Sequence, residues 1–305
     1  MKKCMGIDKM KIFITGVCGQ LGYDLAREGL KRGMEVYGTD LSGETPLEEI
    51  HYQVLDIRDK EKIEEVLLSI KPDIVFHSAA WTAVDDAEEE ANRENVYQVN
   101  EEGTAYLAEI CRKIEAKIIY LSTDYVFSGE GTSPWKADSK DFSPLNIYGD
   151  SKLKGETVVS NFSEKFFIVR IAWVFGIQGN NFIKTMLRVG KKYEEVRVVM
   201  DQIGRPTYTY DLASLLYEMA ETEEYGYYHI TNEGDYISWY DFTCEIYNQA
   251  GLDTKVTPVT TEEYGVSKAK RPSNSRLDTS KLLEKGFKPL PEWKDALARY
   301  LKEID

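Results

Sequence analysis

A tyrosine and a lysine in the middle of this chain have the residue types and the spacing for proton transfer. Tyr148 and Lys152 lie four positions apart at the start of a helical pattern, so both side chains share one face of the helix. An ammonium group stabilises a nearby phenolate, and Lys152 is therefore expected to lower the tyrosine pKa from about 10 toward the range of a general acid. Because Tyr-x-x-x-Lys occurs by chance in many helices, this interpretation requires a cofactor site elsewhere in the chain.

The apolar run before this helix predicts a strand that ends in polar side chains. Lys117–Leu121 is followed by Ser122, Thr123 and Asp124, and then by a long loop with glycine and proline that leads to Tyr148. From the end of such a strand, the Thr123 hydroxyl could donate a hydrogen bond to a substrate oxygen.

A glycine-rich turn near the start of the chain predicts a dinucleotide site. The apolar run Lys11–Thr15 leads into Gly16, Gly19 and Gly22 at a spacing of three residues, and a helical pattern follows. In such a turn the first glycine allows the tight bend, the second lets the backbone approach a pyrophosphate, and the third permits close packing of helix and strand. The start of the helix then offers unpaired N–H groups to the phosphates.

An acidic residue after the second predicted strand bears on the choice of cofactor. Asp40 follows the run Glu35–Thr39, about 20 residues after the glycine turn, where a carboxylate suits a ribose 2′-hydroxyl and repels a 2′-phosphate. This favours NADH over NADPH, although either nucleotide remains open. The alternative is a turn aspartate, because Ser42 and Gly43 follow.

Strand and helix patterns alternate along most of the chain. Further strands are predicted at 54–57, 73–78, 166–171 and 227–231, with a helix over 59–70 and one long helix over 88–113. Such alternation is typical of a parallel sheet with helices on both faces. We therefore predict an α/β fold, with a Rossmann-type doubly wound parallel sheet and a smaller α/β substrate-binding domain. The NAD(P)-binding domain is expected to comprise residues 1–172 and 208–232, and the nucleotide-sugar-binding domain residues 173–207 and 233–305.

The polar and small residues of interest fall at the carboxyl ends of the predicted strands, where ligands bind in sheets of this kind. They are Gly16–Gly22, Asp40, Asp56, Ala79–Thr82, Thr123 and Trp173. This convergence, rather than any single motif, indicates that Tyr148 and Lys152 are catalytic.

Composition and charge exclude several classes of function. The net charge of −14 argues against binding to nucleic acid or to an anionic membrane, since both attract basic surfaces. No apolar run approaches the roughly 20 residues of a membrane span, and no signal peptide is expected. The cysteines are Cys4, Cys18, Cys111 and Cys244, which like the three histidines lack metal-ligand spacing. No metal site is predicted, and reduced thiols in the cytoplasm are expected.

Several longer segments add to these motifs, and those at 122–127 and 271–275 are much more specific than the glycine turn. They read Thr-Gly-Val-Cys-Gly-Gln-Leu-Gly at 15–22, Ala-Ala-Trp-Thr-Ala-Val-Asp at 79–85, Ser-Thr-Asp-Tyr-Val-Phe at 122–127, Asp-Gln-Ile-Gly-Arg-Pro-Thr at 201–207 and Arg-Pro-Ser-Asn-Ser-Arg-Leu-Asp at 271–278. Together with Tyr148 and Lys152, these segments resemble extended short-chain dehydrogenase/reductases and, more narrowly, dTDP-4-dehydrorhamnose reductases. The resemblance runs from about Lys11 to the C-terminus, with departures at Ser78, Trp81 and Ser128.

The resemblance implies NAD(P)H-dependent reduction of the C4 ketone of dTDP-6-deoxy-L-lyxo-4-hexulose to dTDP-L-rhamnose, a precursor of cell-surface polysaccharide. Tyr148 would protonate the C4 oxygen, Lys152 would hold the nicotinamide ribose, and Thr123 would bond the reacting oxygen. The other implied cofactor-binding residues are Gly16, Gly19, Gln20, Leu21, Gly22, Asp40, Asp56, Ile57, Ala79, Ala80, Thr82 and Asn100. The other implied substrate-binding residues are Val84, Asp124, Tyr125, Trp173, Arg271, Asn274 and Ser275.

Two questions have alternative answers: the role of the basic segment near the C-terminus and the reaction that the protein catalyses. Arg271 and Arg276 could bind a diphosphate or could be surface-loop arginines. The same scaffold also serves nucleotide-sugar epimerases and reductases of other 4-keto sugars, as well as non-catalytic regulatory subunits such as that of methionine adenosyltransferase. The expected partner is a small nucleotide sugar, and a homodimer is left open.

Overall fold

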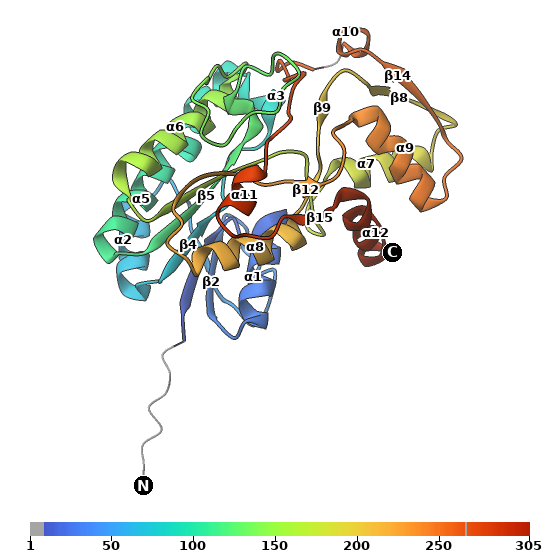
Figure 1. Ribbon diagram of the computed structural model, residues 1–305. Helices are drawn as coiled ribbons and strands as arrows, with labels where there is room; N and C mark the ends of the chain where they lie inside the picture. The colour runs from blue at the N-terminus through green and yellow to red at the C-terminus, as the bar shows by residue number, and fades with distance from the viewer. Residues whose placement is uncertain (1–8, 266) are drawn as a thin grey trace.

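Seven parallel strands form the central sheet of this chain, whose computed structural model describes residues 9–265 and 267–305 (Figure 1). They are β1 (Lys11–Thr15), β2 (Glu35–Asp40), β3 (His51–Val54), β4 (Ile74–His77), β5 (Lys117–Thr123), β6 (Phe166–Ile171) and β11 (Gly226–His229). Their order in the sheet is β11-β6-β5-β4-β1-β2-β3, so the winding reverses between β1 and β4. In sheets of this type a ligand crevice forms at such a reversal, outside the carboxyl ends of the strands.

Helices cover both faces of the sheet because the central strands bury apolar side chains on both sides. α1 (Gln20–Lys31) and α8 (Thr209–Ala220) share one apolar cluster with the strands, and α2 (Lys60–Ile70), α5 (Gly103–Ile114) and α6 (Ile147–Phe162) contribute to the other. Figure 1 shows α2, α5 and α6 on one side of the sheet and α1 and α8 on the other. The predicted α/β fold with a doubly wound parallel sheet is confirmed.

The third strand differs from its predicted position. β3 spans His51–Val54, whereas the apolar alternation predicts a strand at 54–57. Leu55 and Ile57 are buried, but the chain turns at Asp56, whose carbonyl accepts a hydrogen bond that leads into α2. The apolar pattern therefore reflects the packing of a connection against the helices rather than a strand.

The single helix predicted over 88–113 is interrupted in the structure. The short α3 (Val84–Ala87) precedes α4 (Glu90–Tyr97), a π-helical turn η1 (Gln98–Glu102) and then α5. A π-helical turn adds a residue to the helix, and such turns are frequent at functional sites. This one contains Asn100, whose side chain is buried.

Short strand pairs and helices after β6 build a second apolar centre, on the right of Figure 1. It contains α7 (Phe182–Gly190), α9 (Trp239–Ala250) and α12 (Trp293–Ile304), and β8 (Glu195–Val199) pairs in parallel with β14 (Lys255–Val259). Ser238 begins α9 with a capping box. The remaining elements are η2 (Asp124–Val126), β7 (Val174–Phe175), β9 (Ile203–Gly204), β10 (Thr207–Tyr208), β12 (Asn232–Glu233), β13 (Ile237–Ser238), α10 (Thr261–Tyr264), α11 (Ser280–Glu284) and β15 (Leu290–Glu292).

Within residues 9–265 and 267–305, no helix combines the length and the apolar character needed to cross a lipid bilayer. Cys18, Cys111 and Cys244 are free thiols, and Cys4 lies outside the described residues.

Candidate active site

A cavity of about 860 Å³ opens at the carboxyl ends of the central strands and extends to the residues of α7 and α9. The predicted cofactor residues that line it are Gly16, Gly19, Gln20, Leu21, Gly22, Asp40, Asp56, Ile57, Ala79, Ala80 and Thr82. The predicted catalytic and substrate residues that line it are Thr123, Tyr148, Lys152, Val84, Asp124, Tyr125, Trp173 and Arg271. The fold therefore brings residues from both halves of the chain to one cavity.

The glycine turn at one end of the cavity has a backbone that larger residues would disturb. Gly16 has a φ of +70°, and a Cβ there would lie 2.7 Å from the Ala79 nitrogen. A Cβ at Gly22 would lie 2.1 Å from the Gly16 carbonyl oxygen, which shows how closely α1 approaches the turn. Gly19 precedes α1 without a side-chain cap, so the first N–H groups of the helix remain available. This arrangement fits the pyrophosphate of a dinucleotide.

Gln20 lines the cavity and also joins the two regions of the protein. Its Oε1 accepts hydrogen bonds from the backbone N–H of Gly176 at 2.8 Å and from Asn181 Nδ2 at 3.1 Å. Asn181 is the residue that caps α7. The glutamine therefore holds the segment before α7 against the glycine turn.

Two acidic residues lie at the adenosine end of the expected cofactor path. Asp40 ends β2, and its Oδ2 accepts a hydrogen bond from the backbone N–H of Cys18 in the glycine turn at 3.0 Å. The Asp56 carboxylate accepts a hydrogen bond from the Arg58 guanidinium, and this bond is the main cause of the lowered pKa of Asp56. Asp40 thus lies at the end of β2 beside the glycine turn, and its contact with a ribose stays a prediction.

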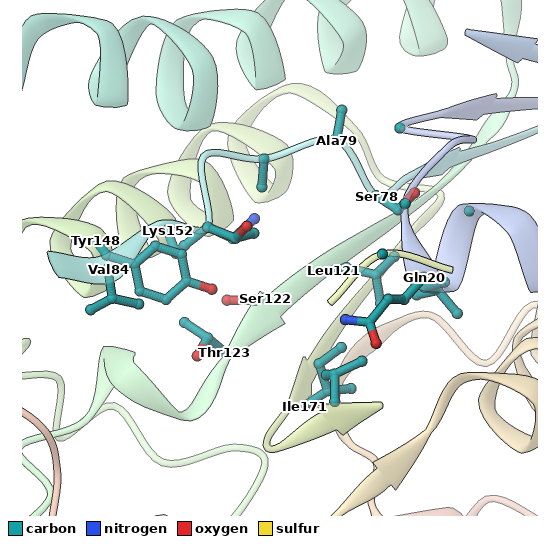
Figure 2. Close-up of a pocket in the computed structure, with 18 of the residues that line it drawn as sticks. Gln20, Ser78, Ala79, Val84, Leu121, Ser122, Thr123, Tyr148, Lys152 and Ile171 are labelled. Carbon is teal, nitrogen blue, oxygen red and sulfur yellow. The ribbon is translucent and has the colours of Figure 1, made fainter. Parts of the chain in front are cut away.

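The three predicted catalytic residues meet at the junction of β5 and α6. Thr123 ends β5, whereas Tyr148 and Lys152 project from the first turns of α6, as Figure 2 shows. Two glycines let the helix approach closely: a Cβ at Gly149 would lie 2.3 Å from the Tyr125 carbonyl oxygen, and one at Gly155 would lie 2.0 Å from the Tyr120 hydroxyl.

The electrostatics of this junction differ from the sequence expectation. Burial raises the pKa of Tyr148 to about 12, although a hydrogen bond with Thr123 opposes the rise. Burial also lowers the pKa of Lys152 to about 7, and the charge of Glu156 opposes that change. The expectation that Lys152 lowers the pKa of Tyr148 is therefore wrong in direction for the protein chain itself, because removal from water dominates both groups. The phenol stays protonated at neutral pH, which is the form that a proton donor requires.

A buried carboxyl group lies next to the threonine. Thr123 Oγ1 donates to Asp124 Oδ1 at 3.1 Å and accepts from the Tyr125 N–H at 3.3 Å. Asp124 is 3% exposed, and among the described residues its Oδ2 has no hydrogen-bond partner. Burial raises the pKa of this carboxyl group to about 6. The ring of Tyr125 meets that of Tyr148 edge-on at 5.7 Å and completes this wall.

Asn100, Asn274 and Ser275 do not line the cavity, because their polar groups are used to hold the chain. Asn100 Oδ1 accepts from the Trp81 N–H at 2.8 Å, and its Nδ2 donates to Ser151 Oγ at 2.9 Å. Asn274 Nδ2 donates to backbone carbonyls of the loop that follows β5, and the Ser275 N–H donates to a carbonyl at β9. These residues support the walls of the site, and their direct contact with a ligand stays a prediction.

Arg271 is at the cavity, whereas Arg276 is not. Arg271 Nη2 donates to Asp85 Oδ2 at 2.7 Å, and Asp85 also accepts from the Ala269 N–H and from Ser267 Oγ. Burial alone would raise the pKa of Asp85, but these donors lower it to about 2. Arg276 Nη1 instead donates to Asn274 Oδ1 at 3.0 Å.

Sequence reasoning missed an aromatic wall contributed by the second region. Trp239 and Phe242 of α9 and Phe182 of α7 line the cavity. Trp239 stacks on Trp173 with ring centroids 3.7 Å apart, and Trp173 has a φ of 50°, which is unusual for a large side chain. The other lining residues outside the prediction are Thr39, Leu41, Leu55, Ser78, Val99, Leu121, Ser122, Ile171, Ala172, Val174, Phe175, Gly179, Asn180 and Ile183. Those at strand ends follow from the sheet, but no local sequence signal marks the aromatic wall.

Comparisons with known proteins agree with this geometry. A family model described as the RmlD substrate binding domain matches residues 10–305. The spore coat polysaccharide biosynthesis protein SpsK of Bacillus subtilis (strain 168) is 38% identical over 293 residues, which cover 96% of this chain and 97% of that protein. A dTDP-4-dehydrorhamnose reductase of Aggregatibacter actinomycetemcomitans is 39% identical over 301 residues, covering 94% of this chain and 97% of the relative.

A solved structure also shows the likeness in three dimensions. The crystal structure of dTDP-4-dehydrorhamnose reductase from Bacillus anthracis in complex with NADP superposes with a TM-score of 0.89 at 38% identity, covering 97% of this chain and 99% of that one. The family match, the identities and the shared architecture extend over nearly the whole chain, which therefore belongs to the dTDP-4-dehydrorhamnose reductase family.

Proposed function

We propose that this protein reduces the C4 ketone of dTDP-6-deoxy-L-lyxo-4-hexulose to dTDP-L-rhamnose with NADH or NADPH. The observation that carries the proposal is the convergence of Thr123, Tyr148 and Lys152 on the cavity that also contains the glycine turn. A reductase requires a cofactor cradle and a proton donor at one place, and this cavity offers both.

The residues at the β5–α6 junction would divide the work of reduction. The nicotinamide cofactor supplies the hydride that adds to the ketone carbon. Tyr148 donates its phenolic proton to the carbonyl oxygen, and Thr123 stabilises the negative charge that develops there. Lys152 holds the cofactor ribose and, when protonated, favours the phenolate that Tyr148 becomes.

The choice of nicotinamide nucleotide is part of the proposal. The Bacillus anthracis structure contains NADP, so a 2′-phosphate is accepted within the family. In this chain the Asp40 carboxylate accepts a hydrogen bond from the Cys18 N–H at the end of β2, and a carboxylate there would repel a 2′-phosphate. We therefore propose that the protein uses NADH in preference to NADPH.

The nucleotide-sugar end of the cavity is proposed to lie between Arg271 and the aromatic wall. Arg271 could give its guanidinium to the diphosphate, as a fork of donors suits phosphate oxygens. Val84, Tyr125 and Trp173 would then surround the sugar. With this assignment, residues 1–172 and 208–232 would bind the cofactor, residues 173–207 and 233–305 would bind the nucleotide sugar, and the enzyme would act in the cytoplasm.

The deciding experiment measures loss of NADH or NADPH absorbance with the keto sugar made in situ from dTDP-glucose by the upstream dehydratase and epimerase. Oxidation that depends on both upstream enzymes is expected, with NADH the better donor. An epimerase would return its cofactor unchanged, so a converted sugar without net NADH loss would contradict the proposed reaction. NADH binding without turnover of any keto sugar would instead indicate a regulatory protein.

A further inference from the structure

A buried ion pair lies behind the catalytic helix. Glu156 of α6 and Arg170 of β6 are each 1% exposed. Arg170 Nε donates to Glu156 Oε1 at 2.8 Å, and Arg170 Nη2 donates to Glu156 Oε2 at 2.7 Å. Burying two charges is costly, and apolar residues in the same place often give equal or greater stability. The location of the pair is therefore more informative than its contribution to folding.

Glu156 is linked to the catalytic residues in two ways. It lies one helical turn after Lys152, so the two side chains share a face of α6. Its Oε1 also accepts a hydrogen bond of 2.6 Å from the hydroxyl of Ser122, which lines the cavity immediately before Thr123. Figure 2 shows Ser122 and Thr123 on β5 facing the helix that carries Tyr148 and Lys152. The carboxylate thus joins the strand that positions the hydroxyl donor to the helix that positions the phenol.

Arg170 is itself fixed from the far side. Its Nη1 donates to the carbonyl of Ala137 at 3.0 Å and contacts His229 Nε2 at 3.2 Å. Burial and the charge of Arg170 lower the pKa of His229 well below its usual value, so the imidazole is neutral and its Nδ1–H donates to the Trp135 carbonyl. The rings of Phe127, Phe142 and Tyr227 surround the guanidinium. With Arg170 held in this way, the Glu156 carboxylate has a fixed position.

We propose that Glu156 is a positioning residue of the reductase, whose carboxylate holds Thr123 opposite Tyr148 through Ser122 and places a negative charge one helical turn from Lys152. The inference rests on the proposed function. Burial disfavours the Lys152 cation, and Glu156 is the group that opposes this effect.

The groups around Lys152 and Glu156 come from four strands and one helix. Those around Lys152 are Tyr148 and Glu156 of α6, the ring of Tyr120 in β5 at 4.1 Å from Nζ, and the neutral His77 of β4. Those around Glu156 are Ser122 and Tyr120 of β5 and Arg170 of β6, with His229 of β11 behind the arginine. Among these described groups, Glu156 is the one carboxyl group next to the lysine.

The test replaces both charges with amides of similar shape, in the variant E156Q/R170Q, so that no unpaired charge remains buried. The matched control is D211N/R299Q, because Arg299 donates to both oxygens of the buried Asp211 at 2.7 Å and this pair lies outside the cavity lining. Three quantities are measured for each protein: thermal unfolding, the dissociation constant of NADH as a function of pH, and kcat and KM for the keto sugar.

Loss of the Glu156 charge should let the Lys152 pKa fall. The pH at which NADH binding weakens should therefore move to lower pH in E156Q/R170Q but not in the control. At about pH 7.5, kcat should fall by about tenfold or more, with KM for the keto sugar nearly unchanged. The NADH measurement needs no keto sugar, so failure of the proposed reaction is distinguished from failure of this inference.

A folded E156Q/R170Q with the pH dependence and kcat of the control would overturn the proposal. If the double variant does not fold, S122A provides the test. It removes the hydrogen bond between Ser122 and Glu156 and leaves the Glu156–Arg170 ion pair in place. S122A is expected to lower kcat several-fold while the pH dependence of NADH binding stays as in wild type. A kcat within about twofold of wild type would remove the positioning role.

Discussion

Asp85 and Arg271 are far apart in the sequence, but the guanidinium of Arg271 donates to the Asp85 carboxylate at 2.7 Å at the edge of the cavity. Asp85 lies in the first turn of α3 on the cofactor side, and Arg271 belongs to the C-terminal segment. The ion pair therefore links the two regions and aims the arginine at the proposed diphosphate site. Because its fork of donors has more N–H groups than one carboxylate uses, Arg271 can bind a second anion while paired.

Arg271→Ala should raise KM for the nucleotide sugar by about tenfold or more with a smaller change in kcat, because it removes binding energy far from the reacting carbonyl. Steady-state kinetics at saturating NADH give both constants. Arg276→Ala is the matched control, since that arginine bonds to Asn274 outside the cavity lining. An equal change of KM in the two variants would indicate that Arg271 is a surface-loop arginine and does not bind the substrate.

Tyr148→Phe should lower kcat by about a hundredfold or more, because the variant loses the proton donor and keeps the ring. NADH should still bind with nearly unchanged affinity, as measured by the quenching of protein fluorescence or the rise in NADH fluorescence. Tyr193→Phe offers a control, because that tyrosine is exposed and lies outside the cavity lining. If Tyr148→Phe turned over like wild type, the assignment of Tyr148 as the acid would have to be abandoned.

Asp124 should make the protein less stable as the pH rises. Its pKa is about 6 in the folded state and 3.8 as an unperturbed group, so between these values the folded state binds the extra proton. The contribution of Asp124 to the free energy of unfolding is therefore most favourable below about pH 4. Above about pH 6 its ionisation lowers the free energy of unfolding by up to roughly 3 kcal/mol.

Asp124→Asn should accordingly raise the midpoint of thermal unfolding at about pH 8 relative to wild type, with a smaller gain at about pH 4.5. Burial also raises the pKa of Asp24 to about 6, and Asp24 lies away from the cavity lining. A comparison with Asp24→Asn therefore tests whether the pH-dependent gain in the unfolding midpoint is specific to Asp124. A gain that is the same at both pH values would show that Asp124 does not titrate in this window.

Asp40→Ala should shift the preference of the enzyme toward NADPH. Removal of the carboxylate ends the repulsion of a 2′-phosphate and also the hydrogen bond to a 2′-hydroxyl, so the ratio of kcat/KM for NADPH to that for NADH should rise by about tenfold. The ratio is obtained from the two oxidation rates with the same keto sugar. Asp56→Ala, at the other acidic residue of this end of the cavity, should change the ratio much less. An unchanged ratio in Asp40→Ala would favour the interpretation of Asp40 as a turn residue.

Gly22→Ala should abolish NADH binding, since the added Cβ would lie 2.1 Å from the Gly16 carbonyl oxygen and would push α1 away from the turn. Gly43→Ala is a suitable control, because nothing lies within 4 Å of a Cβ at that position. Calorimetry with NADH and thermal unfolding would separate lost binding from lost folding. Normal NADH affinity in Gly22→Ala would exclude the glycine turn as the cradle of the pyrophosphate.

The sequence by itself determined the parts of this protein that depend on local patterns. The glycine spacing, the apolar strands and the helical start at Tyr148 each require only neighbouring residues, and parallel strands necessarily collect their carboxyl ends at one edge. Gly16, Asp40 and Thr123 therefore lie at the cavity as expected. The likeness to a known family adds residue roles, and the ligand contacts that it implies for Asn100, Asn274 and Ser275 stay predictions, because these residues lie outside the cavity lining.

The tertiary structure decided what depends on packing and on removal from water. The stack of Trp173 on Trp239 joins residues whose separation along the chain leaves no local pattern. Where the helix is interrupted, the Asn100 side chain bonds to the Trp81 backbone and to Ser151, partners that no local pattern indicates. Above all, the pKa of Tyr148 rises rather than falls, because burial acts on the phenol more strongly than the lysine next to it. Burial is a property of the folded whole, and no spacing of residues along a chain specifies it.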